Sequence, residues 1–297
     1  MKLDIGIVIL HYNDAQMTEN YIRNLNNLNW EDIRWHIIVV DNASPDGSGV
    51  LLKSKYTGSK NVTVLINERN EGFARGNNVG IRYCYESLNA ELIVVSNNDI
   101  IIEDERFFLK LRDIYEQEKF AVVGPDIYSL KKEIHQSPIR NSLLTEEDVN
   151  NKINKIDKTL KKLMIIQKIH MYDTLSKMKR LLGKKPGIEG VHYSERQKNV
   201  VLQGAFFALS TKYMECYPQG LYEKTFLYME EDILAYLCHK AGLYMLYTPE
   251  LQVKHIDGYS TLRENGDRCK KYIFELRETK ESCKNFIELM EDCNGNF

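Results

Sequence analysis

The sequence predicts an α/β protein whose central, mostly parallel sheet is flanked by helices. Short runs rich in β-branched residues recur through the first hundred residues at spacings of about 26 to 31 residues, with helical patterns between them. This alternation is typical of successive βαβ units. The runs are continuously apolar, as expected for strands covered on both faces. They are Ile5–Leu10, His36–Val40, Val62–Ile66 and Leu92–Ser96.

Helices are expected between these strands and after them. Apolar residues at helical spacing predict one helix between the first two strands and another between the third and fourth. A further helix is expected near Glu105–Gln117, followed by a strand at Phe120–Gly124 and a small hairpin at Ile127–Gln136. The apolar positions of the first two helices are Met17, Tyr21, Leu25 and Leu28, and then Phe73, Ile81 and Leu88.

A Lys-rich stretch from about Thr145 to Lys185 interrupts this pattern. Between Asn151 and Lys185 it holds eleven Lys or Arg against two Asp, a net charge of +9, with Ile and Leu at heptad-like intervals. It predicts a helical insertion within residues 140–190. Two interpretations stay open: the insertion lies on an anionic membrane surface, or it packs on a neighbouring helix or mediates a homo-oligomer.

The last third returns to strand and helix patterns. We expect a strand at Val200–Leu209, an amphipathic helix at about Glu230–Ala241 and a strand at Leu243–Tyr247. Residues Asp267–Asp292 predict one long charged helix. Its inward residues are expected to be Tyr272, Leu276, Phe286 and Leu289.

Composition excludes several classes of protein. The 297 residues are 43% apolar and 28% charged, which is enough apolar content for a full core and argues against disorder. A net charge of −2, from 40 basic and 42 acidic residues, argues against a dedicated nucleic-acid binder. Six cysteines without a CxxC pair predict a reduced, cytoplasmic protein. The apolar start of the chain is too short for a membrane span, and no small-residue cleavage site of a leader follows it.

Polar residues follow every early strand. Because parallel strands end on one edge of a sheet, where such folds bind ligands, these residues predict a binding site. Turn preference explains any one of them alone, but four in succession favour function. The segments are His11-Tyr12-Asn13-Asp14, Asp41 to Ser48, Asn67 with Asn70 to Asn78, and Ser96-Asn97-Asn98-Asp99.

The binding mode differs from the common nucleotide motifs. The sequence has no GxxxxGK[ST] phosphate loop, and its glycines after the third strand do not form GxGxxG. Asp41 can accept a hydrogen bond from a base imide or a ribose hydroxyl. Asp99 ends an apolar strand and offers a hard oxygen ligand for Mg²⁺ or Mn²⁺ on a diphosphate.

Six motifs together resemble the family 2 glycosyltransferases of GT-A fold, and among them the rhamnosyltransferase-like enzymes of bacterial surface polysaccharide synthesis. The resemblance covers about residues 3–128 and 200–262. It implies a Rossmann-like, mostly parallel sheet flanked by helices, with a helical insertion and a C-terminal helix. The motifs are VVDNASPDGS, NEGFARGNNVGI, VVSNNDI, LQGAFFALS, FLYMEEDILAYLCHKAG and VKHIDGYST.

The resemblance also divides the chain. Residues 1–128 would form the nucleotide-sugar-binding half of the GT-A domain, and residues 200–262 its acceptor and catalytic half. The Lys-rich insertion at 140–190 and a helical tail at 263–297 lie outside these halves.

Binding roles follow from the matched positions. Asp41 would contact the nucleotide base, Asn98 would face the ribose, and Asp99 would bind the metal, with His255 completing the metal or diphosphate site. The NND sequence departs from the family's DxD motif, so only one carboxylate is left for the metal. The remaining candidates for nucleotide-sugar contacts are His11, Asn13, Asn70, Arg75, Asn77, Gln203 and Gly204.

The catalytic base is expected in the acidic cluster Glu230-Glu231-Asp232. An inverting transfer needs one carboxylate to remove the acceptor's hydroxyl proton. Acids also favour the first turn of a helix for electrostatic reasons. Alignment on Leu234 and Gly242 places the family's ED pair on Glu230-Glu231, whereas the literal ED is Glu231-Asp232. Glu231 and Asp232 both remain candidates.

We therefore expect a metal-dependent inverting glycosyltransferase. It would move a hexosyl group from a UDP-, dTDP- or GDP-sugar to a glycan or lipid-linked saccharide, in the cytoplasm or peripherally at the inner face of the cell membrane. The alternative is an inactive nucleotide-sugar-binding or scaffold protein of the same fold. A nucleotidyltransferase is disfavoured because HYNDAQ offers no Gly-rich basic loop after the first strand.

Overall fold

A computed structural model describes residues 4–168, 192–257 and 268–294. The described chain divides into two compact units. The larger comprises Met1–Leu143, Gly190–Phe226 and Glu230–Leu262, and the smaller comprises Leu144–Glu189, Leu227–Met229 and Arg263–Phe297.

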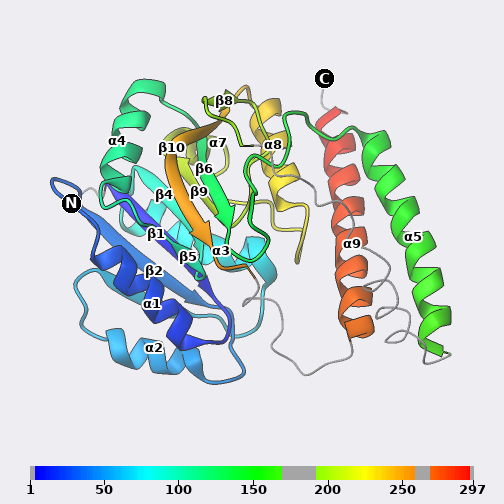
Figure 1. Cartoon of the computed structure of the whole chain (residues 1–297), viewed down its shortest axis with the longest axis horizontal. Helices are drawn as coiled ribbons and strands as arrows, with labels where there is room; N and C mark the ends of the chain where they lie inside the picture. The colour runs from blue at the N-terminus through cyan, green and yellow to red at the C-terminus, as the bar shows by residue number, and fades with distance from the viewer. Residues whose placement is uncertain (1–3, 169–191, 258–267, 295–297) are drawn as a thin grey trace. The chain divides into compact units, whose positions relative to one another are not determined.

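The larger unit is built on a ten-stranded mixed sheet (Figure 1). Its main path runs β3-β2-β1-β4-β9-β6-β10-β5, with β7 paired to β6 and β8 paired to β10. Strands β3, β2, β1 and β4 are parallel neighbours, while β9 pairs antiparallel with both β4 and β6. The strands are β1 (Ile5–His11), β2 (Trp35–Asp41), β3 (Val62–Ile66), β4 (Leu92–Asn97), β5 (Ile100–Ile101), β6 (Val122–Ser129), β7 (Ile134–His135), β8 (Gln197–Lys198), β9 (Phe206–Ser210) and β10 (Met245–His255).

Helices cover both faces of this sheet, as the apolar strands predict. Tyr21, Leu52 and Phe107 come from three helices and are buried in one core. Ile81 and Leu234 belong to the core of the other face. Full burial of such side chains stabilises a fold by roughly 1.5–3 kcal/mol each. The helices are α1 (Ala15–Asn26), α2 (Ser48–Tyr56), α3 (Gly72–Arg82) with a π-turn η1 (Tyr83–Ser87), α4 (Phe107–Glu118), α7 (Thr211–Cys216) and α8 (Glu230–Lys240).

The smaller unit contains two long helices that run side by side, α5 (Glu146–Lys168) and α9 (Arg268–Asn294) (Figure 1). Leu163 packs against Cys269 and Ile273, and Lys280 pairs with Asp157 at 2.5 Å. The helical insertion is therefore confirmed as far as Lys168, and α5 packs on a neighbouring helix. The rest of the expected insertion, 169–185, lies outside the described residues.

Three expectations need correction. Tyr272 does not face inward and is 40% exposed, because this end of α9 buries Cys269 and Ile273, and Tyr272 lies about 100° around the helix from Ile273. The strand expected at Val200–Leu209 begins only at Phe206, since the chain turns at Gln203-Gly204, where the Gln203 Oε1 accepts a hydrogen bond from the Ala205 amide at 2.6 Å.

The third correction concerns β10, which continues to His255 and not only to Tyr247. Pro249 lies within this longer strand, although proline cannot donate to a strand ladder. The structure accommodates it in a register shift between Thr248 and Gln252. The extension carries His255 to the edge of the sheet where the strand-end residues lie.

Candidate active site

The polar strand ends meet at one edge of the larger unit, as predicted. In the parallel register His11 lies beside Asp41, and Leu10 lies beside Asn97. Asp99 follows in the turn after β4. The expectation that these segments share the carboxyl edge is confirmed.

Asp99 and His255 face each other in this edge. Asp99 has no exposed surface and His255 is 6% exposed. The Nε2 atom of His255 lies 3.2 Å from Oδ1 of Asp99. The pairing of β5 with β10 produces this arrangement, because His255 is in register with Ile100 and the Ile256 amide donates to the Asp99 carbonyl at 3.0 Å.

The orientation of the His255 ring follows from Gln136. The Gln136 Nε2 donates to Asp257 at 3.2 Å, which fixes the amide so that its oxygen accepts from Nδ1 of His255 at 2.9 Å. In a neutral ring, Nε2 then presents a lone pair to the Asp99 carboxylate. Two acceptors at this separation need a cation or an added proton between them. The donor set therefore fits a divalent ion bound by Asp99 and His255, with Gln136 orienting the imidazole.

Several predicted site residues carry buried oxygens without a hydrogen-bond partner. Within the described residues, neither carboxylate oxygen of Asp99 receives a hydrogen bond, and the Oδ1 atoms of Asn13 and Asn77 also lack one. Buried polar atoms in proteins are nearly always hydrogen-bonded, so such exceptions call for an explanation. All three side chains were predicted from the sequence as ligand-binding residues.

His11 lies beneath this edge and not at its surface. The Asn98 Nδ2 donates to Oγ1 of Thr18 at 3.0 Å, so the Thr18 hydroxyl is free to donate to Nδ1 of His11 at 2.7 Å. The Nε2–H of His11 can then donate to Oγ of Ser48 at 2.8 Å. Burial lowers the pKa of His11, although the negative charges of nearby aspartates act in the opposite direction. The lowered pKa agrees with a neutral ring. His11 thus links the Asp41 loop to Asn98, and both of its ring nitrogens have partners within the protein.

Asp41 is also more enclosed than the sequence suggested. It is 2% exposed, and its Oδ1 accepts from the Ser44 hydroxyl at 2.5 Å. The Ser44 hydroxyl oxygen in turn accepts from the Asn13 amide at 2.8 Å. Asp41 therefore holds the loop after β2 against the end of β1.

The side chain of Asn42 joins the loops after β2 and β3 through hydrogen bonds. This role was not predicted from the sequence. Its Nδ2 donates to Asn70 at 2.9 Å and to the Gly72 carbonyl at 3.0 Å, and its Oδ1 accepts from the Glu71 amide at 3.0 Å. Asn70 is exposed but its Oδ1 is used in this network. Arg75 is also exposed, and its Nε lies 3.3 Å from the Glu71 carboxylate.

The acidic cluster starts α8, as expected, and its members differ in surroundings. Asp232 is 9% exposed and ion-paired with Arg140. Glu231 lies against Gly204, where an added Cβ would stand 2.8 Å from its Oε1. Glu230 and Glu231 also line a small hollow with Phe73 and Leu221. Of the three acids, Glu231 is brought next to the Gln203-Gly204 turn.

A close backbone contact connects α3 with the chain entering α8. Gly72 has a φ of +77°, and a Cβ there would lie 2.2 Å from the carbonyl oxygen of Phe226. The Phe73 amide donates to that same carbonyl at 2.8 Å. Only glycine fits this position without displacing the backbone.

Comparisons with known proteins agree on the kind of molecule. Residues 6–176 match the model of the family described as glycosyl transferase family 2. The chain is 32% identical over 143 residues to a dTDP-rhamnosyl transferase, RfbF, of Shigella flexneri, covering 48% of this chain and 44% of the relative. It is 27% identical over 124 residues to a low-salt glycan biosynthesis hexosyltransferase, Agl10, of Haloferax volcanii, covering 42% of this chain and 36% of the relative. The matches thus span less than half the length of these curated relatives.

Solved structures show a similar fold at low identity. TarS 1-349 of S. aureus in complex with UDP-GlcNAc aligns with a TM-score of 0.53 and 10% identity, over 92% of this chain and 64% of that one. GalNAc-T7 with UDP, GalNAc and Mn²⁺ aligns with a TM-score of 0.58 and 12% identity, over 99% of this chain and 55% of that one. The expected fold is confirmed.

Proposed function

Because the chain belongs to glycosyl transferase family 2, we propose that it transfers a sugar from a nucleotide-diphosphate sugar to a glycan or lipid-linked saccharide, with inversion at the anomeric carbon. One observation carries the proposal most directly. The buried Asp99 carboxylate, without a hydrogen-bond donor among the described residues, faces Nε2 of His255 at the carboxyl edge of the sheet.

Asp99 and His255 would hold a divalent cation, Mg²⁺ or Mn²⁺. When bound, the cation neutralises the negative charge that develops on the leaving diphosphate. Gln136 keeps the His255 ring in a binding orientation, and Asn98 is the neighbouring candidate for the ribose. We place Asn13, Asn70, Arg75 and Asn77 on the nucleotide-sugar side, with Asp41 and His11 as residues that position this edge.

We assign the base to Glu231. Its carboxylate lies beside Gly204 and is free of the Arg140 ion pair that engages Asp232. In the proposed step the acceptor hydroxyl loses its proton to Glu231 while its oxygen forms a bond to C1. The bond from C1 to the diphosphate oxygen breaks, and its electron pair leaves with the nucleotide. Gly204 and Gln203 would shape the floor below the sugar.

The donor class is tested by a screen of dTDP-, UDP- and GDP-sugars, in which dTDP-rhamnose comes first because of the similarity to the Shigella relative. Release of nucleoside diphosphate and calorimetric binding are both measured, with Mg²⁺ or Mn²⁺ and with EDTA. We expect one nucleotide class to bind and turn over only with metal. Binding without turnover for every donor and for lipid-linked and free glycan acceptors would contradict transfer and favour the inactive alternative.

The cationic face of α5 supports a peripheral membrane role. Lys155, Lys158, Lys161 and Lys162 are exposed, and Ile165 beside them is 63% exposed. Lysines near an anionic surface contribute roughly 1 kcal/mol each to binding. We propose that this face meets anionic lipid headgroups where a lipid-linked acceptor resides. No described helix has the length and apolar composition required to cross a membrane.

A further inference from the structure

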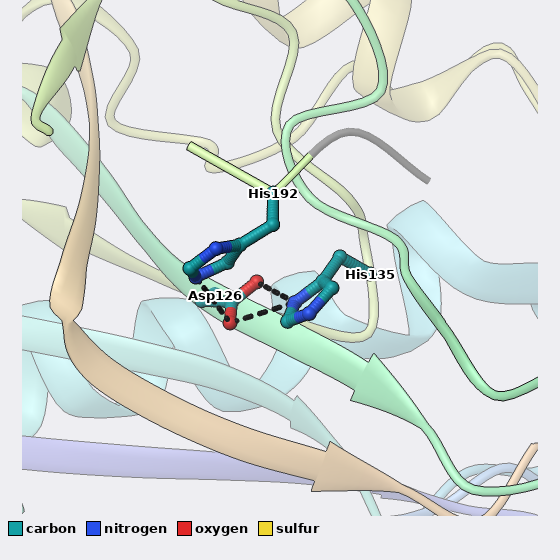
Figure 2. A group of neighbouring side chains, drawn as sticks. All are labelled: Asp126, His135 and His192. Atoms are coloured by element: carbon teal, nitrogen blue, oxygen red, sulfur yellow. Dashed lines mark hydrogen bonds and ion pairs between the residues drawn. The ribbon is translucent and has the colours of Figure 1, made fainter. Parts of the chain in front are cut away.

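Three metal-binding side chains converge in the larger unit, away from the Asp99 site. Asp126 comes from β6, His135 from β7, and His192 from the chain before β8 (Figure 2). One ligand atom from each lies within 4.8 Å of the others. Asp126 is buried, His135 is half-buried and His192 is exposed. None of them was singled out from the sequence, because the histidines are 57 positions apart and show no motif.

Hydrogen bonding links two of the three side chains, and the third lies beside them. Nδ1 of His135 lies 2.8 and 2.9 Å from the two Asp126 oxygens and can donate to them. Nε2 of His192 approaches the same carboxylate at 3.8 Å, which is too long for a hydrogen bond. The two imidazole rings are nevertheless only 4.3 Å apart between centroids. Figure 2 shows both rings directed at the Asp126 carboxylate.

The cluster is separate from the Asp99 site although one hairpin carries parts of both. Side chains alternate between the faces of a strand. Asp126 and His135 lie on one face of the β6–β7 hairpin. Ser129 and Gln136 belong to the other face and bond to Asp257, and Gln136 reaches His255.

The surroundings provide access and support. A hollow of about 460 Å³ adjoins the cluster, lined by all three side chains together with Tyr128, Glu103 and Lys254. It gives an ion a path and leaves room for water ligands. The residue after His192 is also held in place, because the Tyr193 carbonyl accepts a hydrogen bond from the Tyr247 hydroxyl at 3.2 Å.

We propose that Asp126, His135 and His192 form a second metal site, specific for a Zn²⁺-like transition-metal ion. Two imidazoles and a carboxylate are a donor set for zinc and related borderline metals, with the remaining position open to water. The Asp99 site, with its carboxylate and expected diphosphate, suits a harder ion. At the new site the ion replaces the proton between His135 and Asp126 and draws in His192. It thereby ties the β6–β7 hairpin to the chain that leads into β8.

The test uses the full chain, stripped with EDTA and dialysed, with millimolar Mg²⁺ to fill the Asp99 site. Zn²⁺ binding is measured by calorimetry, and Co²⁺ binding by its visible absorption. We expect one equivalent of either ion. His192→Ala, which changes an exposed side chain, and His135→Ala should each weaken binding at least tenfold. The matched control is His239→Ala, an exposed histidine on α8, which should bind like the parent.

Two results would overturn the proposal. The first is the absence of a stoichiometric Zn²⁺ or Co²⁺ equivalent in the parent protein. The second is binding that survives both histidine substitutions but is lost in Asp99→Ala, which would place the ion at the other site. Because no readout uses a nucleotide sugar, failure here leaves the proposed glycosyl transfer standing, and failure of the donor screen leaves this site standing.

Discussion

The guanidinium of Arg140, which is half-buried, is ion-paired with the buried carboxylate of Asp232 in the first turn of α8. This pair gives Asp232 a structural partner that neighbouring Glu231 does not share in the structure. An ion-paired carboxylate is a weaker proton acceptor, because the positive charge stabilises its ionised form. The two acids that the sequence could not separate therefore have different expected roles.

Substituting each acid separates catalysis from stability. Glu231→Gln should lower kcat by ~10²–10⁴-fold, the usual effect of losing a general base, with the Kd for the donor nearly unchanged. Asp232→Asn should lower the free energy of unfolding by about 1–3 kcal/mol because it removes the ion pair with Arg140. Steady-state kinetics and urea unfolding of both variants measure this. A larger kcat loss in Asp232→Asn than in Glu231→Gln would reverse the assignment.

Gln136 should control metal affinity at the Asp99 site without touching the ion. Gln136→Ala releases the His255 ring, and loss of such an orienting contact typically weakens metal binding ~10–100-fold. The activity of this variant should therefore need more Mn²⁺ for half-saturation while approaching the parent kcat at high Mn²⁺. Gln16→Ala, at an exposed position on α1, is the matched control. Identical Mn²⁺ titrations for the Gln136 and Gln16 variants would refute this role.

Gly72→Ala tests the backbone contact with Phe226. The added methyl group would lie 2.2 Å from the Phe226 carbonyl oxygen, in addition to the strain of a positive φ. Gly58→Ala is the matched control, since its φ of +78° is nearly the same but nothing lies within 4 Å of the added Cβ. The control should lose about 1 kcal/mol of stability and the Gly72 variant clearly more. Equal urea midpoints would show that the contact carries no energy.

The stability of the protein should fall as the pH is lowered from about 6.5, the ordinary pKa of histidine. Burial lowers the pKa of His11 in the folded state, so the unfolded chain takes up the proton first and gains stability relative to the fold. The slope per group is at most about 1.4 kcal/mol per pH unit. Urea unfolding between pH 5 and 8 measures it, and His11→Asn should flatten the curve. Burial lowers the pKa of His36 as well, so part of the slope should remain.

The cationic face of α5 should bind anionic vesicles. Reversing the charge of Lys155, Lys158, Lys161 and Lys162 should reduce co-sedimentation with anionic vesicles several-fold, and high salt should reduce it in the parent. Four exposed lysines outside α5, Lys53, Lys60, Lys131 and Lys224, serve as the matched control set. Equal loss with both sets would indicate a general charge effect. Unchanged binding after α5 reversal would leave the packing or oligomer interpretation.

Much of the N-terminal part of the fold was predictable because local patterns and final structure agree there. The four apolar runs became parallel neighbours β1 to β4, and the polar ends reached one edge. Asp99 was identified because it follows a buried strand. Its contact with His255 also requires β10 to continue past Pro249. Proline disfavours a continuous strand, but the pairing of β10 with β6 and β5 stabilises it.

Other parts of the site depend on contacts between distant segments. In the sequence Asn42 resembles an ordinary turn residue. Its hydrogen bonds form only because the loop after β3 lies next to it in the fold. His11 follows a strand and was therefore expected to contact a ligand. In the structure its Nδ1 atom is hydrogen-bonded to the hydroxyl of Thr18 on α1. The Arg140 partner of Asp232 lies 92 positions away in the chain, so no spacing rule could suggest it.

The two-residue strand β7 gives the proposed metal sites a thermodynamic relation. His135 and Gln136 are consecutive, so restraining one restricts the backbone that places the other. If an ion at the His135 cluster raises affinity at Asp99 by some factor, linkage requires the ion at Asp99 to raise affinity at the cluster by the same factor. Zn²⁺ titrations with and without Mn²⁺ would give this coupling free energy. With such coupling, the concentration of one metal ion in the cell would change how tightly the protein binds the other.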